Sequence, residues 1–437
     1  MLDGLDDVEW DRLGHAYGSA ADVPDQIRAL RSFDPKVREK ALEALFGNIF
    51  HQGSRYQASA YAVPFLLELL AAEDTPEPDW VSSLLTSLAI GYDEGHLPDG
   101  FPVDDLRRSA EGGRELLAAK PPPGDEGEYL EYRYLESLDG ADQNRFWEYV
   151  SLAVYDAVRE GVPLFRRLLD HPDPQLRIGA AYALAWFPQD AADSLAALVR
   201  VTTPQPSTTR FVRSPVEVAT AVVAAGLLGA APDPGLLTDP RPVVRWAAAV
   251  GRARVLGEHC DAATVDELLR WTTPQPGADP QAGAGPQAGA DPETGADPQA
   301  GAGSEGADGG DEEVPFLDGD LGGYAALALR QCGPQHADRA FDALLDRLPT
   351  VTGTEALPVA TEALRMAFPQ GPLAAGTPAA GLPPRQRRLV ETLAAAEGTW
   401  LFGDRTFGNF SMLVGEYGLP RNRDAMRAYL DDVAEPV

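Results

Sequence analysis

The chain has 437 residues, of which 44% are hydrophobic, and a formal net charge of −31 at pH 7. Proteins that bind phosphates gain affinity from clustered lysine and arginine, so this charge disfavours a nucleic-acid or anionic-membrane binder and favours a basic protein partner. The N-terminal sequence lacks the pattern of a signal peptide, and no run of about 18 apolar residues predicts a membrane helix. Cys260 and Cys332 form no CxxC motif and indicate neither a disulfide framework nor a zinc site, so we expect a cytoplasmic protein.

The first elements of the chain are predicted to be short helices. Residues 5–16 predict a capping helix with Trp10 and Leu13 on its inner side. A valine–proline pair then opens an apolar stretch at three places, as expected where proline occupies the first turn of a helix. In each case an aspartate follows the proline by ten positions, and the three sets are Val23, Pro24 and Asp34, then Val63, Pro64 and Asp74, then Val162, Pro163 and Asp173. This spacing predicts a structural repeat.

Two of these aspartates begin nearly superimposable helices. From Asp34 the chain reads D-P-K-V-R-E-K-A-L-E-A-L, and from Asp173 it reads D-P-Q-L-R-I-G-A-A-Y-A-L, with a looser copy after Asp239. The pattern resembles D-x-x-V-R-x-x-A-A-x-A-L, the first-helix pattern of the HEAT-repeat (armadillo-like) family, including actinobacterial proteins with HEAT repeats. This resemblance implies an all-α fold, an α-solenoid of about five to seven helical repeats.

The resemblance also implies a structural role for the arginine of each copy. In HEAT arrays the aspartate caps its own helix while the arginine pairs with the cap of the neighbouring repeat. Here that ladder would consist of Asp34, Arg38, Asp173, Arg177, Asp239 and Arg245. The alternative interpretation is that the three arginines form a line of cations along the groove of the solenoid.

Changes in periodicity and composition divide the chain into five parts. They are N-terminal HEAT-like repeats (1–91), an irregular insertion (92–141), central HEAT-like repeats (142–271), an acidic low-complexity linker (272–313) and C-terminal degenerate repeats (314–437). The linker has nine acidic and no basic residues, and it is predicted to be disordered because it has too little apolar surface to bury. The last part is predicted to form helices at 321–332, 335–348, 355–367, 384–397, 406–417 and 422–432.

Two stretches contain candidate partner-binding residues. The loop from His51 to Tyr56 places His51, Arg55 and Tyr56 beside a flexible glycine, although an ordinary hydrogen-bonded turn has the same composition. Residues 129–155 contain seven aromatic residues, where the 35 aromatics of the chain would predict about two, and aromatics with a polar tip suit interfaces. The candidates from this second stretch are Tyr129, Tyr132, Arg133, Trp147 and Tyr149. Core packing is the alternative interpretation of the same residues.

No motif in the chain predicts catalysis. It contains no Walker loop, no dinucleotide-binding glycine turn, no H-E-x-x-H and no G-x-S-x-G, so we predict no catalytic residue, no metal site and no cofactor. The leading hypothesis is a protein-binding scaffold or adaptor with a basic protein partner, and the sequence contains no indication of its oligomeric state. The alternatives are an immunity protein that neutralises a basic toxin, or a HEAT-like enzyme such as a chromophore lyase or an alkylated-base DNA glycosylase. The glycosylase would need a basic groove.

Overall fold

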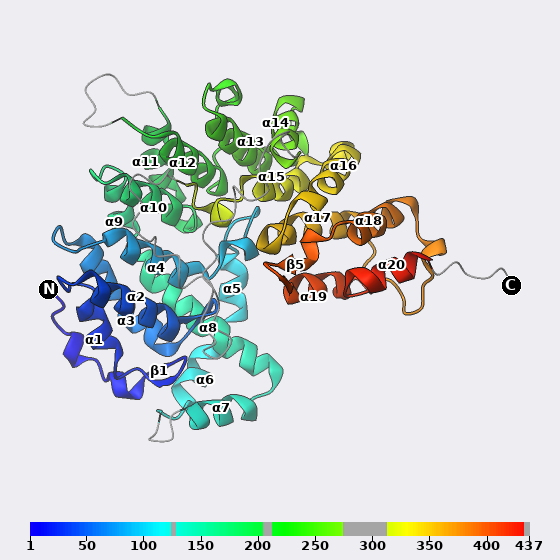
Figure 1. Cartoon of the computed structure of the whole chain (residues 1–437). Helices are drawn as coiled ribbons and strands as arrows, with labels where there is room; N and C mark the ends of the chain where they lie inside the picture. The colour runs from blue at the N-terminus through cyan, green and yellow to red at the C-terminus, as the bar shows by residue number, and fades with distance from the viewer. Residues whose placement is uncertain (124–127, 204–211, 274–312, 432–437) are drawn as a thin grey trace. The chain divides into compact units, whose positions relative to one another are not determined.

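The computed structural model describes residues 1–123, 128–203, 212–273 and 313–431, and its regular structure is almost entirely helical (Figure 1). The predicted all-α class is therefore confirmed. The chain forms two compact units, here called unit 1 (Met1–Glu217) and unit 2 (218–273 and 314–431 of the described residues), with the boundary inside one helix. The linker predicted over 272–313 lies almost wholly outside the described residues. Its first residue, Thr272, ends a helix and is buried.

Unit 1 consists of helices with two small hairpins near its N-terminus. Its hairpin strands are β1 (Gly14–His15), β2 (Gly18–Ser19), β3 (Phe50–His51) and β4 (Ser54–Arg55). Its helices are α1 (Val23–Ala29), α2 (Pro35–Asn48), α3 (Gln57–Ala71), α4 (Pro78–Ile90), α5 (Val103–Ser109), α6 (Gly113–Ala119), α7 (Glu128–Ser137), α8 (Gly140–Arg159), α9 (Val162–Leu168), α10 (Pro174–Leu184), α11 (Ala191–Thr202) and the start of α12 (Pro215–Leu227).

Unit 2 has the same helical character and one further hairpin. Its elements after α12 are α13 (Pro242–Leu256), α14 (Ala262–Thr272), α15 (Leu321–Leu329), α16 (Ala337–Arg347), α17 (Ala356–Ala367), α18 (Pro384–Ala395), β5 (Leu401–Phe402), β6 (Arg405–Thr406), α19 (Gly408–Glu416) and α20 (Arg423–Asp431). The helices predicted for the C-terminal part coincide with α15 to α20 to within three residues at either end. Asn422 caps α20, where its Oδ1 accepts a hydrogen bond from the Ala425 N–H (2.8 Å).

The hairpins were not predicted. Residues 5–16 form two short 3₁₀ turns followed by strand β1, rather than one helix. In the loop between β3 and β4, Gln52 and Gly53 both have positive φ (49° and 79°), as a two-residue type I′ turn requires. The loop predicted from His51 to Tyr56 is thus a tight hairpin that leads directly into α3.

Two further expectations about local structure were wrong. Pro64 does not open a helix, because α3 already begins at Gln57, where the Tyr56 N–H donates to Ser59 Oγ (2.8 Å) and Pro64 lies inside the helix. The insertion predicted as irregular over 92–141 is largely helical, since it contains α5, α6 and α7. Helix α4 packs against α10, so the segment from α5 to α8 is an insertion between two helices of unit 1 that are neighbours in space.

The aspartates of the two closest repeat copies cap their own helices. Asp34 Oδ1 accepts a hydrogen bond from the Lys36 N–H (3.0 Å) at the start of α2, and Asp173 Oδ1 accepts one from the Gln175 N–H (2.9 Å) at the start of α10. In the looser copy, Asp239 lies further from its helix. It accepts hydrogen bonds from the backbone and the side chain of Arg241.

The arginines of the three copies make one recurring set of contacts. In each, Nη1 donates to the carbonyl oxygen six positions earlier: Arg38 to Ser32 (2.8 Å), Arg177 to His171 (2.8 Å) and Arg245 to Asp239 (2.9 Å). The rest of each guanidinium contacts a glutamate further along the chain, and the pairs are Arg38–Glu77, Arg177–Glu217 and Arg245–Glu267.

These contacts correct the expected ladder. The carboxylate that pairs with each arginine belongs to a glutamate and not to a capping aspartate of the repeat motif. Arg38 and Arg177 are buried, and Arg245 is mostly so, which does not fit a line of exposed cations. A buried guanidinium needs both carbonyl and carboxylate acceptors to offset its lost hydration, and these neighbours supply them.

Candidate functional site

Helix α8 is the element around which the candidate site is built. Asp139 caps it by accepting a hydrogen bond from the Asp142 N–H (2.9 Å). Four of its buried side chains recur at every fourth position, namely Phe146, Val150, Val154 and Val158, and Tyr155 is buried beside them. This apolar stripe packs against α3, α4, α5 and α6, as expected for an amphipathic helix. The side chains on the flanks of the stripe, Tyr149 among them, are left at the edges of these helix contacts.

Helix α6 lies in close contact with α8 at Gly113. A Cβ added to Gly113 would lie 2.3 Å from the carbonyl oxygen of Arg145 and 2.4 Å from the Cβ of Tyr149. No side chain fits in that space, so glycine is needed for this approach. The contact holds the N-terminal turn of α6 directly beside Tyr149.

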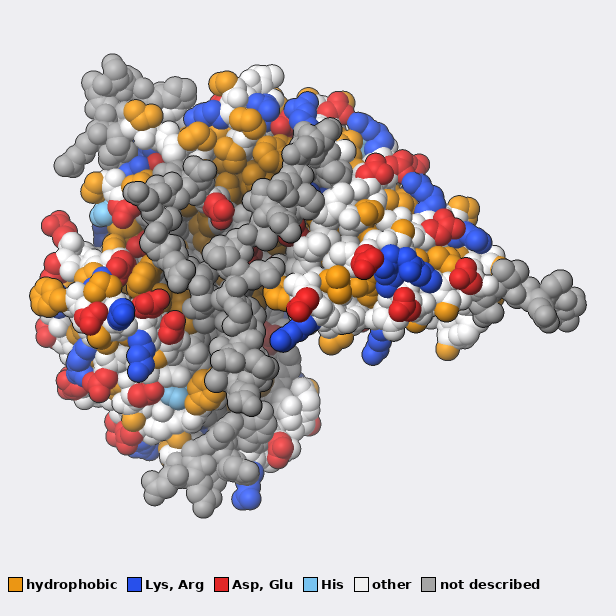
Figure 2. Space-filling view, viewed as in Figure 1, with side chains coloured by type: hydrophobic (Ala, Val, Ile, Leu, Met, Phe, Trp, Pro, Cys, Tyr) orange, Lys and Arg blue, Asp and Glu red, His pale blue; other side chains and the backbone are white. Residues whose placement is uncertain are grey.

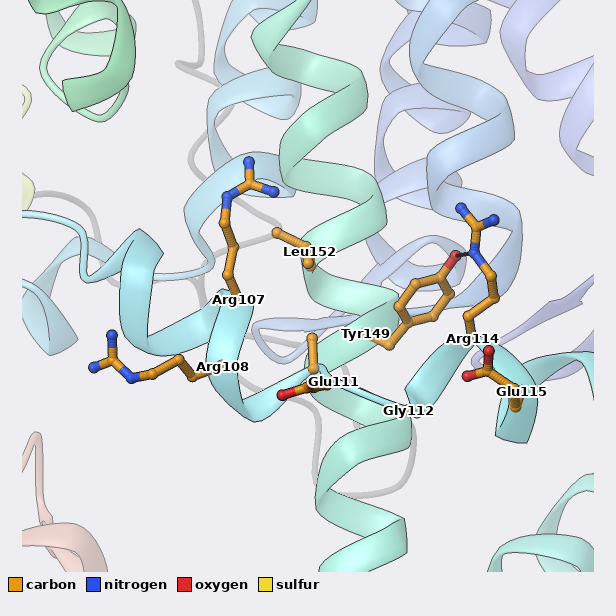
Figure 3. A pocket seen from close by; sticks show the side chains of 9 residues that line it. Arg107, Arg108, Glu111, Gly112, Arg114, Glu115, Tyr149 and Leu152 are labelled. Carbon is orange, nitrogen blue, oxygen red and sulfur yellow. Dashed lines mark hydrogen bonds between the residues drawn. The ribbon is translucent and has the colours of Figure 1, made fainter.

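Two hollows meet at Tyr149, and we call them together the Tyr149 site. The first, of about 420 Å³, lies between the α5–α6 segment and α8 (Figure 3). The second, of about 270 Å³, lies between α3, α6 and α8. Besides Tyr149, the first is lined by Arg107, Arg108, Glu111, Arg114, Glu115 and Leu152. The second is lined by Tyr56, Gln57, Tyr61, Leu117, Val150 and Ala153.

Two arginines of the first hollow are already neutralised. Arg107 forms a two-point ion pair with Asp156 of α8, with nitrogen–oxygen distances of 2.5 and 3.2 Å. Arg108 pairs with Asp105 on its own helix. In Figure 3, Arg107 and Arg108 extend in different directions, so they do not converge on one point. The hollow is therefore not a site built for a phosphate or another anion.

The other charged groups of the first hollow leave an acidic excess. Arg114 Nε donates a hydrogen bond to the Tyr149 hydroxyl (3.1 Å), which fixes the ring between α6 and α8 (Figure 3). Glu111 and Glu115 are exposed, and neither forms an ion pair with any residue that the structure describes. The lining of this hollow thus includes an aromatic ring, two exposed carboxylates and one guanidinium that donates to a neutral hydroxyl, a composition that suits a cationic side chain.

The hairpin residues named from the sequence have different surroundings. His51 is half-buried, and its ring meets that of Tyr17 edge to face at 5.3 Å, with 3.3 Å between His51 Nδ1 and the Tyr17 hydroxyl. Tyr17 itself is 61% exposed. This pair lies where β1–β2 and β3–β4 meet, through the hydrogen bond from the Ala16 N–H to the carbonyl oxygen of Asn48. His51 does not line the Tyr149 site.

Arg55 is turned into unit 1. Its Nη1 donates to the carbonyl oxygen of Gly53 (2.6 Å), and a Cβ added to Gly91 would lie 2.7 Å from the same nitrogen. Burial lowers the pKa of Arg55 to about 10, although the negative charge of Glu148 opposes this shift. The guanidinium is therefore packed inside the unit, which is not the exposed position expected of a partner contact.

The structure brings three of the other predicted residues together. Tyr56, at the start of α3, meets Trp147 of α8 edge to face with ring centroids 6.0 Å apart. Tyr56 and Tyr149 both line the second hollow. Tyr56, Trp147 and Tyr149 are each half-buried, so they support the core from its edge and still present a face to solvent.

The remaining aromatic residues of the dense stretch divide between core and α7. Phe146 is buried, and Tyr155 is buried with its hydroxyl donating to the carbonyl oxygen of Trp186 (3.0 Å), so both belong to the core. On α7, Arg133 is exposed, whereas the side chains of Tyr129 and Tyr132 lie outside the described residues. The proposal for those two tyrosines stays a prediction.

Sequence reasoning missed Glu111, Glu115, Arg114 and Tyr61. Carboxylates are abundant throughout the chain, so Glu111 and Glu115 had no distinguishing signal. Tyr61, which is 48% exposed, follows Gln57 by four positions on α3, and that spacing places both on one helix face. Such a signal indicates a shared face but not what lies across from it.

Surface charge, possible metal ligands and helix hydrophobicity limit the functions that the structure supports. Over helices α1 to α4, the face visible in Figure 2 carries interspersed acidic and basic side chains and no continuous basic band. Within the described ranges, no three His, Cys, Asp or Glu side chains are placed to hold a metal ion. No described helix combines the length and the apolar character needed to cross a membrane.

Comparisons with known proteins do not assign a family. No family model and no curated protein matches the chain. Among solved structures, the crystal structure of an engineered protein matches at 18% identity, covering 94% of this chain and 87% of that chain, with a TM-score of 0.22. A likeness of that size carries no argument about fold or function.

Proposed function

We propose that this chain is a HEAT-like helical-repeat protein that binds a basic segment of a partner protein at the Tyr149 site, and so acts as a scaffold or adaptor. The observation that carries the proposal is the pair of exposed carboxylates, Glu111 and Glu115, beside a half-buried tyrosine at the junction of a charged and an aromatic hollow.

The charged hollow supports recognition of lysine or arginine. A cation over a tyrosine ring is attracted by the ring's quadrupole, and a nearby carboxylate adds a charge-assisted hydrogen bond. Arg107 and Arg108 do not repel such a cation strongly, because Asp156 and Asp105 neutralise them. Among the three arginines that line this hollow, Arg114 differs in that its side chain donates to a neutral group, the Tyr149 hydroxyl.

The second hollow supports recognition of an apolar side chain next to that cation. Its walls are tyrosine rings and aliphatic groups from α3, α6 and α8. Sites for small molecules and cofactors usually occupy about 300 to 1,000 Å³, and the two hollows lie at or below the lower part of that range. Side chains of a peptide segment fit this pair of hollows better than a cofactor does.

The net charge of −31 supports the choice of a basic partner at longer range. Complementary charge steers a partner toward the surface and raises the association rate, whereas well-packed aromatic groups govern dissociation. The recurring Arg38, Arg177 and Arg245 contacts support the repeat part of the proposal, because one set of hydrogen bonds appears at three equivalent helices.

A panel of labelled peptides tests the proposal. Fluorescence anisotropy would compare peptides that pair lysine or arginine with one aromatic residue against peptides in which glutamate replaces each basic residue. We expect binding of the basic set alone. The double variant Glu111→Gln/Glu115→Gln should weaken that binding about five- to tenfold, since each carboxylate contributes a partly exposed charge contact.

The matched control is Glu39→Gln/Glu43→Gln. These glutamates are exposed on α2, have the same four-residue spacing and do not line the Tyr149 site. The control therefore removes the same charge from unit 1 and should change the affinity less than twofold. Equal weakening by both double variants would show that net charge alone attracts the peptide and would overturn the site assignment.

A further inference from the structure

The two cysteines, 72 positions apart in the sequence, lie together in unit 2. Cys260 follows the short 3₁₀ helix Gly257–His259, and Cys332 ends the 3₁₀ helix Arg330–Cys332. These two 3₁₀ helices contact each other, and each thiol donates a hydrogen bond to a backbone carbonyl oxygen, Cys260 to that of Arg252 (3.9 Å) and Cys332 to that of Ala328 (3.8 Å). Sequence spacing could not show this contact.

The backbone around the two thiols is held in place from both sides. Gln335 Nε2 donates to the carbonyl oxygen of Glu258 (2.9 Å) and to that of Cys332 (3.2 Å), which ties the two segments together. Gly333 has φ of 86°, and a Cβ added there would lie 3.1 Å from the Cα of Glu258. The two segments are thus as close as a glycine allows, next to both cysteines.

The two thiols differ in environment. Cys332 is fully buried, whereas Cys260 retains 8% exposure. The interaction with the neighbouring Cys332 thiol lowers the pKa of Cys260 below that of an ordinary thiol, although burial opposes this shift. The interaction with Cys260, together with burial, raises the pKa of Cys332. Cys260 is therefore the better nucleophile of the two, because the thiolate is the reactive form.

We propose that Cys260 and Cys332 are a redox pair that closes to an intramolecular disulfide with a small-molecule disulfide oxidant such as oxidised glutathione. The Cys260 thiolate attacks one sulfur of the oxidant, forming a mixed disulfide and releasing one glutathione thiol. The Cys332 sulfur then attacks the Cys260 sulfur and releases the second glutathione. Two protein thiols are oxidised and one glutathione disulfide is reduced to two thiols.

The consequence of closure is a covalent link between α13–α14 and α15–α16. The bond would close a ring from residue 260 to residue 332 within unit 2. A native-state disulfide of this kind restricts the unfolded chain, so the oxidised form should resist unfolding more than the reduced form.

The test is thiol counting on the full chain by mass spectrometry. The native protein would be incubated in glutathione buffers of increasing oxidised fraction, quenched with acid, and alkylated after denaturation. We expect both thiols to disappear together, and peptides containing Cys260 and Cys332 to appear joined. In Cys332→Ser, the second step is blocked, so Cys260 should accumulate as a stable adduct with one glutathione.

Three results would overturn the proposal. One is a wild-type chain whose two cysteines each carry glutathione without joining. Another is a disulfide between two chains in place of one within the chain. The third is a wild-type chain that stays fully reduced at every buffer composition, over an incubation in which the urea-denatured chain becomes oxidised. None of these results depends on whether the serine variant folds.

Discussion

The ion pair between Arg177 and Glu217 should make a large contribution to the stability of unit 1. The pair is almost completely withdrawn from solvent, with side-chain exposures of 5% and 2%. The glutamate accepts hydrogen bonds from Arg177 Nε (2.8 Å) and Nη2 (2.5 Å), from Arg213 Nη1 (3.2 Å) and from the Ser214 N–H (3.3 Å). The perturbation that tests this is Glu217→Gln, which keeps the shape and removes the charge.

The expected magnitude follows from these contacts. The glutamine amide keeps one acceptor oxygen, but its NH₂ group would face an N–H of Arg177, so at least one charge-assisted hydrogen bond is lost. The buried guanidinium would also lose the negative charge of the carboxylate that two of its N–H groups contact. Breaking a buried pair in this way costs about 3–5 kcal/mol, against a total stability of about 5–15 kcal/mol for a typical domain.

Glu77→Gln is the matched control for this variant. Glu77 contacts Arg38 in the same two-point geometry, yet its side chain is 32% exposed. Water can therefore replace part of the lost interaction, and the cost should be about 1 kcal/mol. Urea unfolding followed by far-UV circular dichroism would measure both variants. Equal losses of stability in the two variants, or a larger loss for Glu77→Gln, would refute the claim that burial of the ion pair determines how much its removal costs.

Two further predictions concern pH and helix packing. Burial tends to raise the pKa of Glu217, but the hydrogen bonds from Arg177 and Ser214 hold it below its ordinary value near 4.5, so the stability advantage of wild type over Glu217→Gln should shrink as pH falls through that pKa. Burial raises the pKa of Asp320 above 3.8. The wild type should therefore lose stability relative to Asp320→Asn as pH rises through the pKa of Asp320 in the folded protein. Urea titrations across pH would measure both pairs, and a stability difference that does not change with pH in either pair would contradict these two predictions. Gly113→Ala should lower the melting temperature by several degrees, because there is no room for the added Cβ. Gly47→Ala has open space around the added Cβ inside α2 and should raise stability by up to about 1 kcal/mol. Calorimetry that shows both variants stabilised, or both destabilised, would be inconsistent with the packing described.

Helix positions were largely predictable because the signals are local. Asp34 and Asp173 precede proline at the start of α2 and α10, and both act as caps within two residues of their own position. Asn422 works in the same way before α20. The strands were not predictable, because a strand of two residues such as Phe50–His51 has no periodicity, and its turn depends on the φ angle of Gln52 as well as of a glycine.

The candidate site was only partly predictable because it depends on contacts between distant segments. The density of aromatic residues identified Trp147 and Tyr149, but it could not separate them from Tyr155, which is in the core. The exposed carboxylate of Glu111, which forms no ion pair within the described part of the chain, becomes meaningful only once Arg107 is seen to pair with Asp156, 49 positions away. Pairings of that kind have no local sequence signal.

The most direct test of the binding proposal is the kinetics of Tyr149 variants with the tightest basic peptide of the panel. Stopped-flow measurements would compare wild type, Tyr149→Ala and Tyr149→Phe at two salt concentrations. Association should slow for all three as the Debye length shrinks from about 10 Å at 0.1 M salt to about 3 Å at 1 M, because steering is electrostatic.

The dissociation rate of the peptide gives the decisive result. We predict that Tyr149→Ala dissociates about 10 to 30 times faster than wild type, equivalent to about 1.5–2 kcal/mol, while its melting temperature changes little because the ring is only half-buried. Tyr149→Phe keeps the ring and should resemble wild type closely. If Tyr149→Ala instead melts much earlier and dissociates from the peptide at the wild-type rate, then Tyr149 is a core residue and the proposed binding site is wrong.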